Sequence, residues 1–203
     1  MIIELYGLPG SGKTNLTKEI VKKTDFRIIK IYKKTELIFY NFLFLIKHPI
    51  KFFTLLFYLI LNSKNFKGFY SKFMNSFLHC NAKYQKSLRY SSAVLDEGYF
   101  INIISIFEKE IDSESLKKYL KFLLWPDVLV VFDNVDFNER SKRIAKRGYG
   151  VANYLKIEER AKWEKVIEKN DKILKENLKN LFIKYIIVDD KKSLSDIMKE
   201  IEE

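Results

Sequence analysis

The sequence predicts an α/β protein in which helices cover both faces of a five-stranded parallel sheet. Short apolar runs, typical of buried strands, alternate with segments of helical spacing along all 203 residues. Gly and Pro number only 7 and 3, while hydrophobic residues make up 47%, which excludes fibrous and disordered chains. No repeat, low-complexity tract or linker divides the chain, so we expect a single domain over residues 1–203.

Five apolar runs are expected to form the strands. Each is bounded by polar or turn-forming residues and is short, as strands buried between two helical layers are. In chain order they cover residues 1–6, 26–32, 92–96, 128–133 and 183–188.

The segments between these runs have the spacing of helices with an apolar face. Asp112 or Ser113 is the expected N-cap of a helix within 99–124. Ser193 is expected to cap the last helix, and Asp196 three residues later completes a capping box. The predicted helical segments are 13–23, 35–89, 99–124, 138–147, 154–181 and the residues after Ser193.

A glycine-rich loop follows the first strand and precedes the first helix. Residues 7–14, GLPGSGKT, match the phosphate-binding pattern G-x-x-x-x-G-K-[ST]. Glycines let backbone N–H groups surround phosphate oxygens, and the helix N-terminus adds partial positive charge. Lys13 is expected to reach the β- and γ-phosphates, and the Thr14 hydroxyl to ligate Mg²⁺. The predicted nucleotide-binding residues are Gly7, Leu8, Pro9, Gly10, Ser11, Gly12, Lys13, Thr14 and Asn15.

Two acids stand at the end of the third predicted strand, in Asp96-Glu97-Gly98. Because ligands gather at the carboxyl ends of parallel strands, we expect these acids beside the phosphate loop. One carboxylate is needed to hold the Mg²⁺ shell, and a second could accept the proton of an attacking hydroxyl. We assign Asp96 to the metal or to the base, and Glu97 as the second candidate. Two solvated acids at a strand end are the alternative interpretation.

Three arginines fall within one stretch of eight residues, although most of the cationic residues of this chain are lysines. Arg140, Arg143 and Arg147 are spaced three and four apart, which places them on one face of the predicted helix 138–147. Like charges on one face repel unless anions meet them, and arginine suits bidentate phosphate recognition and stacking on a base. The segment therefore indicates a phosphate-binding helix, with a solvated basic face as the alternative.

These segments resemble the P-loop kinases of the thymidylate kinase and deoxynucleoside kinase group. The resemblance rests on GLPGSGKT, on VLDEG and on VLVVFDNVDFNERSKRIAKRG, which ends in the R-I-x-x-R-G typical of that group's lid. It implies a three-layer fold with strand order 2-3-1-4-5 and the use of ATP and Mg²⁺. It also implies a lid-like segment at 138–153, in which Arg143 stacks near the adenine and Arg147 contacts the transferring phosphate.

The chain departs from that group on the acceptor side. The group usually carries an acid followed by arginine at the third strand end, whereas Glu97 follows Asp96 here. Lys83, Lys86 and Arg89 precede that strand and are the candidates for the missing acceptor-binding cation. The helical region 35–90 is expected to form the acceptor side, and the acceptor itself stays open.

Residues 37–61 contain two apolar runs of ten residues separated by Lys47-His48-Pro49-Ile50-Lys51. Each run is half the length that a membrane-spanning helix needs. A single pass would put the second and third strands on opposite sides of the membrane, so we exclude a span. One interpretation is a pair of helices buried against the sheet and against each other. The other is an incompletely covered apolar surface, flanked by lysines, that binds an apolar acceptor or rests on anionic lipid.

The net charge indicates which kinds of partner to expect, and the cysteine content indicates the cellular compartment. The net charge of +11 indicates contact with something anionic. The lysines are spread along the whole chain instead of being grouped with stacking aromatics, so nucleic acid is not expected as a partner. One cysteine, Cys80, and an N-terminus without a signal-peptide pattern favour the cytoplasm, with peripheral membrane contact as an option. A homodimer is left open.

The leading hypothesis is an ATP- and Mg²⁺-dependent kinase that phosphorylates a small molecule, either a nucleoside or nucleotide or another hydroxyl metabolite. Its expected catalytic residues are Lys13, Asp96, Glu97, Arg143 and Arg147, and its expected metal ligands are Thr14 and Asp96. The alternative is a P-loop NTPase that hydrolyses ATP or GTP and couples nucleotide state to a membrane surface or a partner. A nucleic-acid 5′-end kinase is a third and weaker hypothesis.

Overall fold

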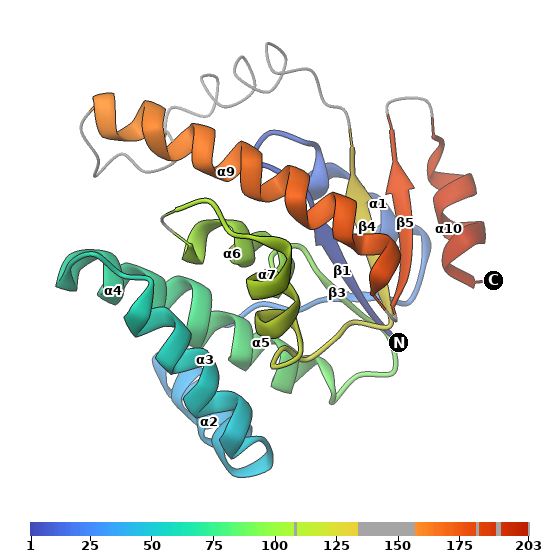
Figure 1. Ribbon diagram of the computed structural model, residues 1–203. Coiled ribbons are helices and arrows are strands. Elements are labelled where there is room, and N and C mark those ends of the chain that lie inside the picture. Colours follow the sequence, from blue (N-terminus) through green and yellow to red (C-terminus); the bar gives the residue numbers. More distant parts are fainter. Residues whose placement is uncertain (108, 134–156, 182, 190–191, 203) are drawn as a thin grey trace.

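The computed structural model describes residues 1–107, 109–133, 157–181, 183–189 and 192–202 (Figure 1). The predicted basic helix 138–147 and the lid-like segment 138–153 lie outside the described residues. The expected roles of Arg140, Arg143 and Arg147 therefore stay predictions from the sequence.

Five strands form one parallel sheet, in the order β2-β3-β1-β4-β5. The strands are β1 (Ile2–Tyr6), β2 (Arg27–Ile28), β3 (Ala93–Leu95), β4 (Val128–Phe132) and β5 (Lys184–Val188). The predicted fold class and strand order are thereby confirmed. In register, β1 places Glu4 beside Leu95 of β3 and Leu129 of β4.

The second strand is much shorter than predicted. The apolar run 26–32 suggested seven residues, but β2 spans two, and the Ile29 N–H adds one further bond to Val94 O at 3.1 Å. β2 is an edge strand whose partner, β3, has only three residues. The length of this strand is therefore limited by the neighbouring strand and not by its own apolar run.

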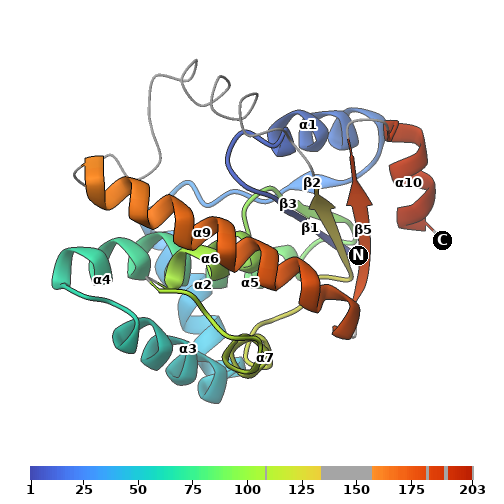
Figure 2. The ribbon, with the colours of Figure 1, turned by 45° about the horizontal axis from the view of Figure 1, so that its top comes forward.

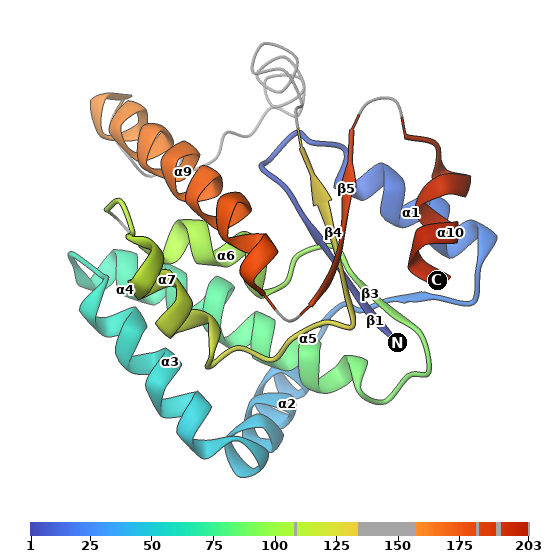
Figure 3. The same ribbon diagram turned by 45° about the vertical axis from the view of Figure 1, so that its right-hand side comes forward.

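Helices cover both faces of the sheet, so the fold has three layers (Figures 2 and 3). One face carries α1 (Lys13–Lys23) and α10 (Leu194–Glu202), which pack on alternate residues of β1 such as Ile3 and Leu5. Tyr6 of β1 packs with the core of the opposite face. That face carries α5 (His79–Ser87), α6 (Tyr99–Ile106), α7 (Ser113–Leu120) and α9 (Ile157–Asn177), which continues into η2 (Leu178–Asn180).

The region between the second and third strands is helical, as predicted. It comprises α2 (Lys34–Lys47), α3 (Pro49–Leu61), α4 (Phe66–Lys72), η1 (Phe73–Leu78) and α5. α2 and α3 meet at His48 with a bend of 114°. η1 is a π-helical turn that joins α4 to α5 in one continuous helix, and the rings of Phe69, Phe73 and Phe77 stack along it.

Two predicted helix caps are confirmed. The Asp112 side chain accepts a hydrogen bond from Ser115 N at 2.8 Å and caps α7. Before α10, Asp196 accepts from Ser193 N, and the Ser193 hydroxyl accepts from Asp196 N, both at 3.2 Å. This reciprocal pair is the predicted capping box, which stabilises the last helix against the sheet.

Candidate active site

The loop between β1 and α1 has the backbone of a phosphate cradle. Gly10 and Gly12 have φ angles of 86° and 101°, a region that favours glycine. A Cβ atom on Gly7 would lie 2.7 Å from Phe132 Cβ and 2.8 Å from Ser11 Oγ, so a side chain does not fit there. Gly7, Gly10 and Gly12, which the sequence predicted as glycines of the loop, are therefore positions at which the backbone geometry disfavours any other residue.

The first turn of α1 brings the ammonium group of Lys13 to the same loop. Lys13 Nζ donates hydrogen bonds to the carbonyl oxygens of Gly7 and Leu8, the latter at 3.2 Å, and lies 3.5 Å from Ser11 Oγ. Thr14 and Asn15 are exposed. No acidic residue stands in this turn, so the partial positive charge of the helix N-terminus is not offset there. These groups fit a triphosphate with its divalent cation.

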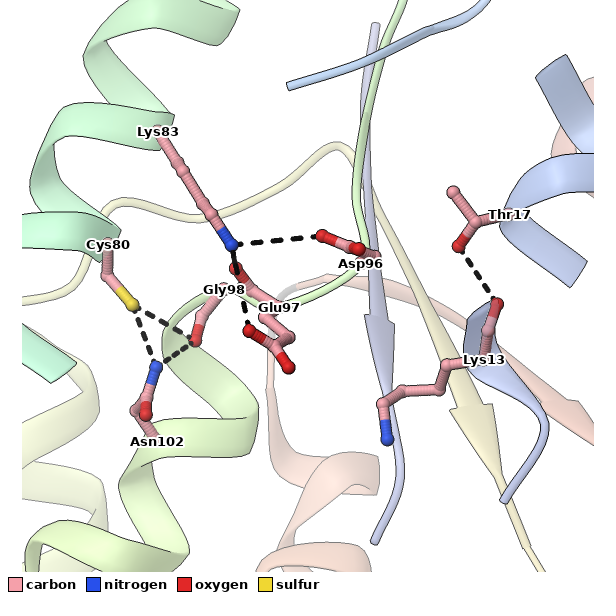
Figure 4. A network of polar contacts seen from close by, with 8 residues as sticks. All are labelled: Lys13, Thr17, Cys80, Lys83, Asp96, Glu97, Gly98 and Asn102. Carbon is pink, nitrogen blue, oxygen red and sulfur yellow. Dashed lines mark hydrogen bonds and ion pairs between the residues drawn. The ribbon is translucent and has the colours of Figure 1, made fainter. Parts of the chain in front are cut away.

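Asp96 and Glu97 follow β3, at the carboxyl edge of the sheet and next to the strand that carries the loop. Lys83 of α5 lies between the two acids (Figure 4), with its Nζ 3.7 Å from Asp96 Oδ1 and 3.9 Å from Glu97 Oε2. The same Nζ donates to Glu97 O at 2.9 Å. The Asp96 side chain is 26% exposed and that of Glu97 71%, so both can meet a ligand. Of the three candidate acceptor cations, the structure brings only Lys83 to these acids.

The other two candidates are used elsewhere. Lys86 pairs with Glu36 of α2 and donates to Lys30 O at 2.7 Å. Arg89 lies beyond the far end of α5, where it lines an open pocket and bonds the Tyr40 hydroxyl at 3.3 Å. Residues Asp96, Glu97 and Gly98 are here called the acidic turn. Neither Lys86 nor Arg89 contacts this turn through a bond that the structure describes.

The side chain of Glu4 is buried and lies against the backbone of the acidic turn. Its side chain accepts hydrogen bonds from Phe100 N, at 2.6 Å, and from the Tyr84 hydroxyl. The backbone of Gly98 passes so close that a Cβ there would lie 2.4 Å from the Glu4 carboxyl carbon. Glu4 thereby joins the start of α6 to the centre of β1, and this fixes the turn that carries Asp96.

Cys80 and Asn102 hold the same turn from its other side (Figure 4). The Cys80 thiol donates to Gly98 O at 3.3 Å, and the Asn102 side-chain amide donates to that oxygen at 2.9 Å. Burial raises the pKa of the Cys80 thiol to about 12, so it stays protonated and serves as a hydrogen-bond donor.

Glu4 makes stability depend on pH. Burial raises its pKa from 4.5 to about 7, although the bonds from Tyr84 and Phe100 lower it. The folded state therefore prefers the protonated form, and this preference is lost as pH rises from 4.5 through 7. We expect the free energy of unfolding to fall by about 2 to 3 kcal/mol between pH 5 and 8 through this group.

Urea denaturation of the wild type and of Glu4→Gln at pH 5, 6, 7 and 8 measures this fall. The amide does not titrate, so the variant should lose most of the pH dependence between 5 and 8. Equal slopes in the two proteins would show that Glu4 does not titrate in this range.

A second buried network connects the loop to α9. The Tyr6 hydroxyl, directly before the loop, donates to the Asp171 carboxylate. Lys175 pairs with Asp171 at 3.0 Å and with Asp133, at the end of β4, at 3.1 Å. The network therefore links β1, β4 and α9 at the carboxyl edge, and it holds the base of the cradle in place.

The sequence analysis missed Glu4 and this second network. The signal for Glu4 was present, because a single acid stands inside the apolar run Ile2–Tyr6 and every residue of that strand is buried. A lone charge in a buried strand must find hydrogen-bond partners. Asp171 and Lys175 gave no comparable signal, since their helix carries many charged residues.

The parallel sheet, its strand order and the helices on both faces give the three-layer fold that the resemblance predicted. No protein-family model matches the sequence, and no curated protein matches it significantly. Among solved structures, the chain is similar to deoxyadenosine kinase from M. mycoides with bound dATP, at 17% identity and a TM-score of 0.59, over 100% of both chains.

A second structure of that enzyme, with the products dCMP and a flexible dCDP bound, gives 19% identity and a TM-score of 0.53. It covers 100% of this chain and 99% of the other. At such identities the similarity concerns the fold. It confirms the resemblance to the deoxynucleoside kinase group at that level.

Proposed function

We propose that the protein is an ATP- and Mg²⁺-dependent kinase that transfers the γ-phosphoryl group to a small molecule, with nucleosides and nucleotides as the first class of acceptor. The observation that carries the proposal is the position of Asp96 directly after β3, the strand next to the one that carries the phosphate cradle, and its ion pair with Lys83 of α5. A solved structure of similar fold is described as a deoxyadenosine kinase with bound dATP, which supports this class of ligand.

On the donor side, the cradle and Lys13 bind the β- and γ-phosphates. Thr14 and Asp96 would hold Mg²⁺, which neutralises charge on the transferring phosphate when it is bound. Thr17 fixes the first turn of α1, since its hydroxyl donates to Lys13 O at 2.9 Å. The backbone of Lys13 is thereby held in place while its side chain reaches the ligand.

On the acceptor side, Asp96 or Glu97 accepts the proton of the attacking hydroxyl. Lys83 holds both carboxylates through its ammonium group and takes the place of the arginine that this chain lacks. Arg143 and Arg147 remain the predicted cations for the adenine and the transferring phosphate.

A phosphoryl-transfer screen tests the function. The purified protein is incubated with γ-labelled ATP, Mg²⁺ and a panel of nucleosides, nucleotides and hydroxyl metabolites. We expect labelled product from at least one acceptor. Release of inorganic phosphate alone, at a steady rate and without transfer to any acceptor, would favour the NTPase hypothesis instead.

Lys83→Ala tests the acceptor side. We expect kcat/KM for the acceptor to fall by about 10²-fold, because misplacement of the carboxylates disturbs the reacting geometry. The KM for ATP should stay within a few-fold of the wild type. Lys83→Arg should recover most of the loss, and Lys86→Ala, one turn further along α5, serves as the matched control. An equal loss in both alanine variants would contradict the assignment.

A further inference from the structure

The helices α2 and α3 are apolar on two sides, and the fold buries only one of them. Leu37, Phe44 and Leu55 are 7%, 0% and 3% exposed and pack into the interior. On the outward side, Ile38, Phe42 and Ile46 form a stripe on α2, and Ile50, Phe53 and Phe57 form one on α3. These six side chains are between 58% and 74% exposed. We call them the apolar stripes.

This exposure is concentrated in one part of the molecule. Among the described residues, fifteen large hydrophobic side chains are exposed, and eleven of them lie between positions 38 and 70. The helices that carry them form the outer end of the molecule, away from β5 and α10 (Figure 3). Scattered single exposed hydrophobics are ordinary, but a concentration of this kind marks an interaction surface.

The charge of the same segment identifies the partner. Residues 33–72 contain seven lysines and a single acid, Glu36, which is paired with Lys86. Lys51 and Lys72 donate to backbone carbonyl oxygens. The five exposed lysines stand at the ends of the helices and not within the apolar stripes; they are Lys33, Lys34, Lys47, Lys64 and Lys67.

We propose that α2, α3 and the start of α4 lie on the surface of an anionic lipid bilayer. The apolar stripes enter the boundary between headgroups and acyl chains, and the lysines at the helix ends contact lipid phosphates. The proposal concerns a surface away from the phosphate cradle and stands independently of the proposed kinase activity.

Two other arrangements fit the structure less well. No single described helix is long and apolar enough to cross a membrane, and the α2–α3 pair that passes by length and composition is bent by 114°. A second copy of the chain would bring two sets of five exposed lysines together, while the one acid of the segment is already paired. Repulsion between the copies therefore favours lipid over self-association.

Vesicle flotation tests the proposal with the full chain and no nucleotide. The probes are vesicles of phosphatidylcholine alone and of phosphatidylcholine with about 30% phosphatidylglycerol, at low and high salt. We expect binding to the anionic vesicles at least tenfold above that to the neutral ones, falling steeply as salt screens the lysines.

Two double variants separate the contribution of the apolar side chains to vesicle binding from that of the lysines. Phe53→Ser with Phe57→Ser should lower vesicle binding by at least tenfold, whereas Leu88→Ser, an exposed apolar residue outside the segment, should leave it unchanged. Lys64→Glu with Lys67→Glu should lower it by about five-fold or more for each lysine.

The matched charge control is Lys18→Glu with Lys22→Glu, on the exposed side of α1. It should affect binding much less than the Lys64 and Lys67 variant does. The variants change exposed side chains, and circular dichroism confirms that each is folded before flotation.

Three results would overturn the proposal. The first is an absence of flotation on anionic vesicles at low salt. The second is equal loss in the segment variants and their controls. The third is a dimer by light scattering that the Phe53 and Phe57 changes convert to a monomer, which would show that a second copy covers the stripes.

Discussion

Lys13→Ala is expected to abolish phosphoryl transfer, with kcat/KM reduced by about 10³-fold or more. Lys13 places its ammonium group at the cradle, where it donates to the loop carbonyls of Gly7 and Leu8. Without it, the backbone amides still surround the phosphates, but the charge that develops during transfer loses its main protein counter-ion. Initial-rate kinetics with the acceptor found in the screen, together with calorimetric titration of Mg²⁺–ATP, measure the two effects.

Lys18→Ala on the same helix is the control, since Lys18 is exposed and lies beyond the first turn. It should retain wild-type kinetics. If Lys13→Ala binds Mg²⁺–ATP and turns over like the wild type, the loop does not hold the triphosphate and the proposed function fails with it.

Gly98→Ala is expected to destabilise the fold by about 3 kcal/mol or more, the sum of overpacking and of a strained buried hydrogen-bond network. The new Cβ would lie 2.4 Å from the carboxyl carbon of Glu4. That carboxylate cannot retreat without loss, because Phe100 N and the Tyr84 hydroxyl hold it at the start of α6. Urea denaturation at pH 7 measures the change.

Gly68→Ala, within α4, is the matched control. There the helix propensity of alanine should leave stability unchanged or raise it by about 1 kcal/mol. In a Glu4→Ala background the clash is absent, so the added cost of Gly98→Ala should shrink well below its cost in the wild type. Strict additivity would show that Gly98 and Glu4 do not share the strain.

Much of the fold could be predicted because its signals are local. The phosphate loop, the Asp112 cap and the Ser193–Asp196 box are each encoded within a few residues, and all lie where predicted. The extent of β2 could not be read in the same way, because the apolar run 26–32 continues beyond the short partner strand.

The residues of the acceptor side also depend on contacts between segments that are far apart in the sequence. Lys83 lies thirteen residues before Asp96 on a helix with one other lysine, Lys86, and only the packing of α5 against β3 selects it. The segment 37–61 left two interpretations open, and each describes one side of the helices. Leu55 is buried while Phe57, two residues on, is 59% exposed. Composition alone does not separate the two sides, since both are apolar.

The π-helical turn η1 also bears on how this architecture could change over evolutionary time. A π-turn accommodates one residue more than an α-helix, so a deletion within Phe73–Leu78, for example of the exposed Asn75, could close as ordinary α-helix. Because the π-turn already absorbs the extra residue, the helix before it would keep nearly the same rotational phase relative to α5. The π-turn thus marks a position at which the chain could lose one codon while the apolar stripes keep their angle relative to the carboxyl edge of the sheet.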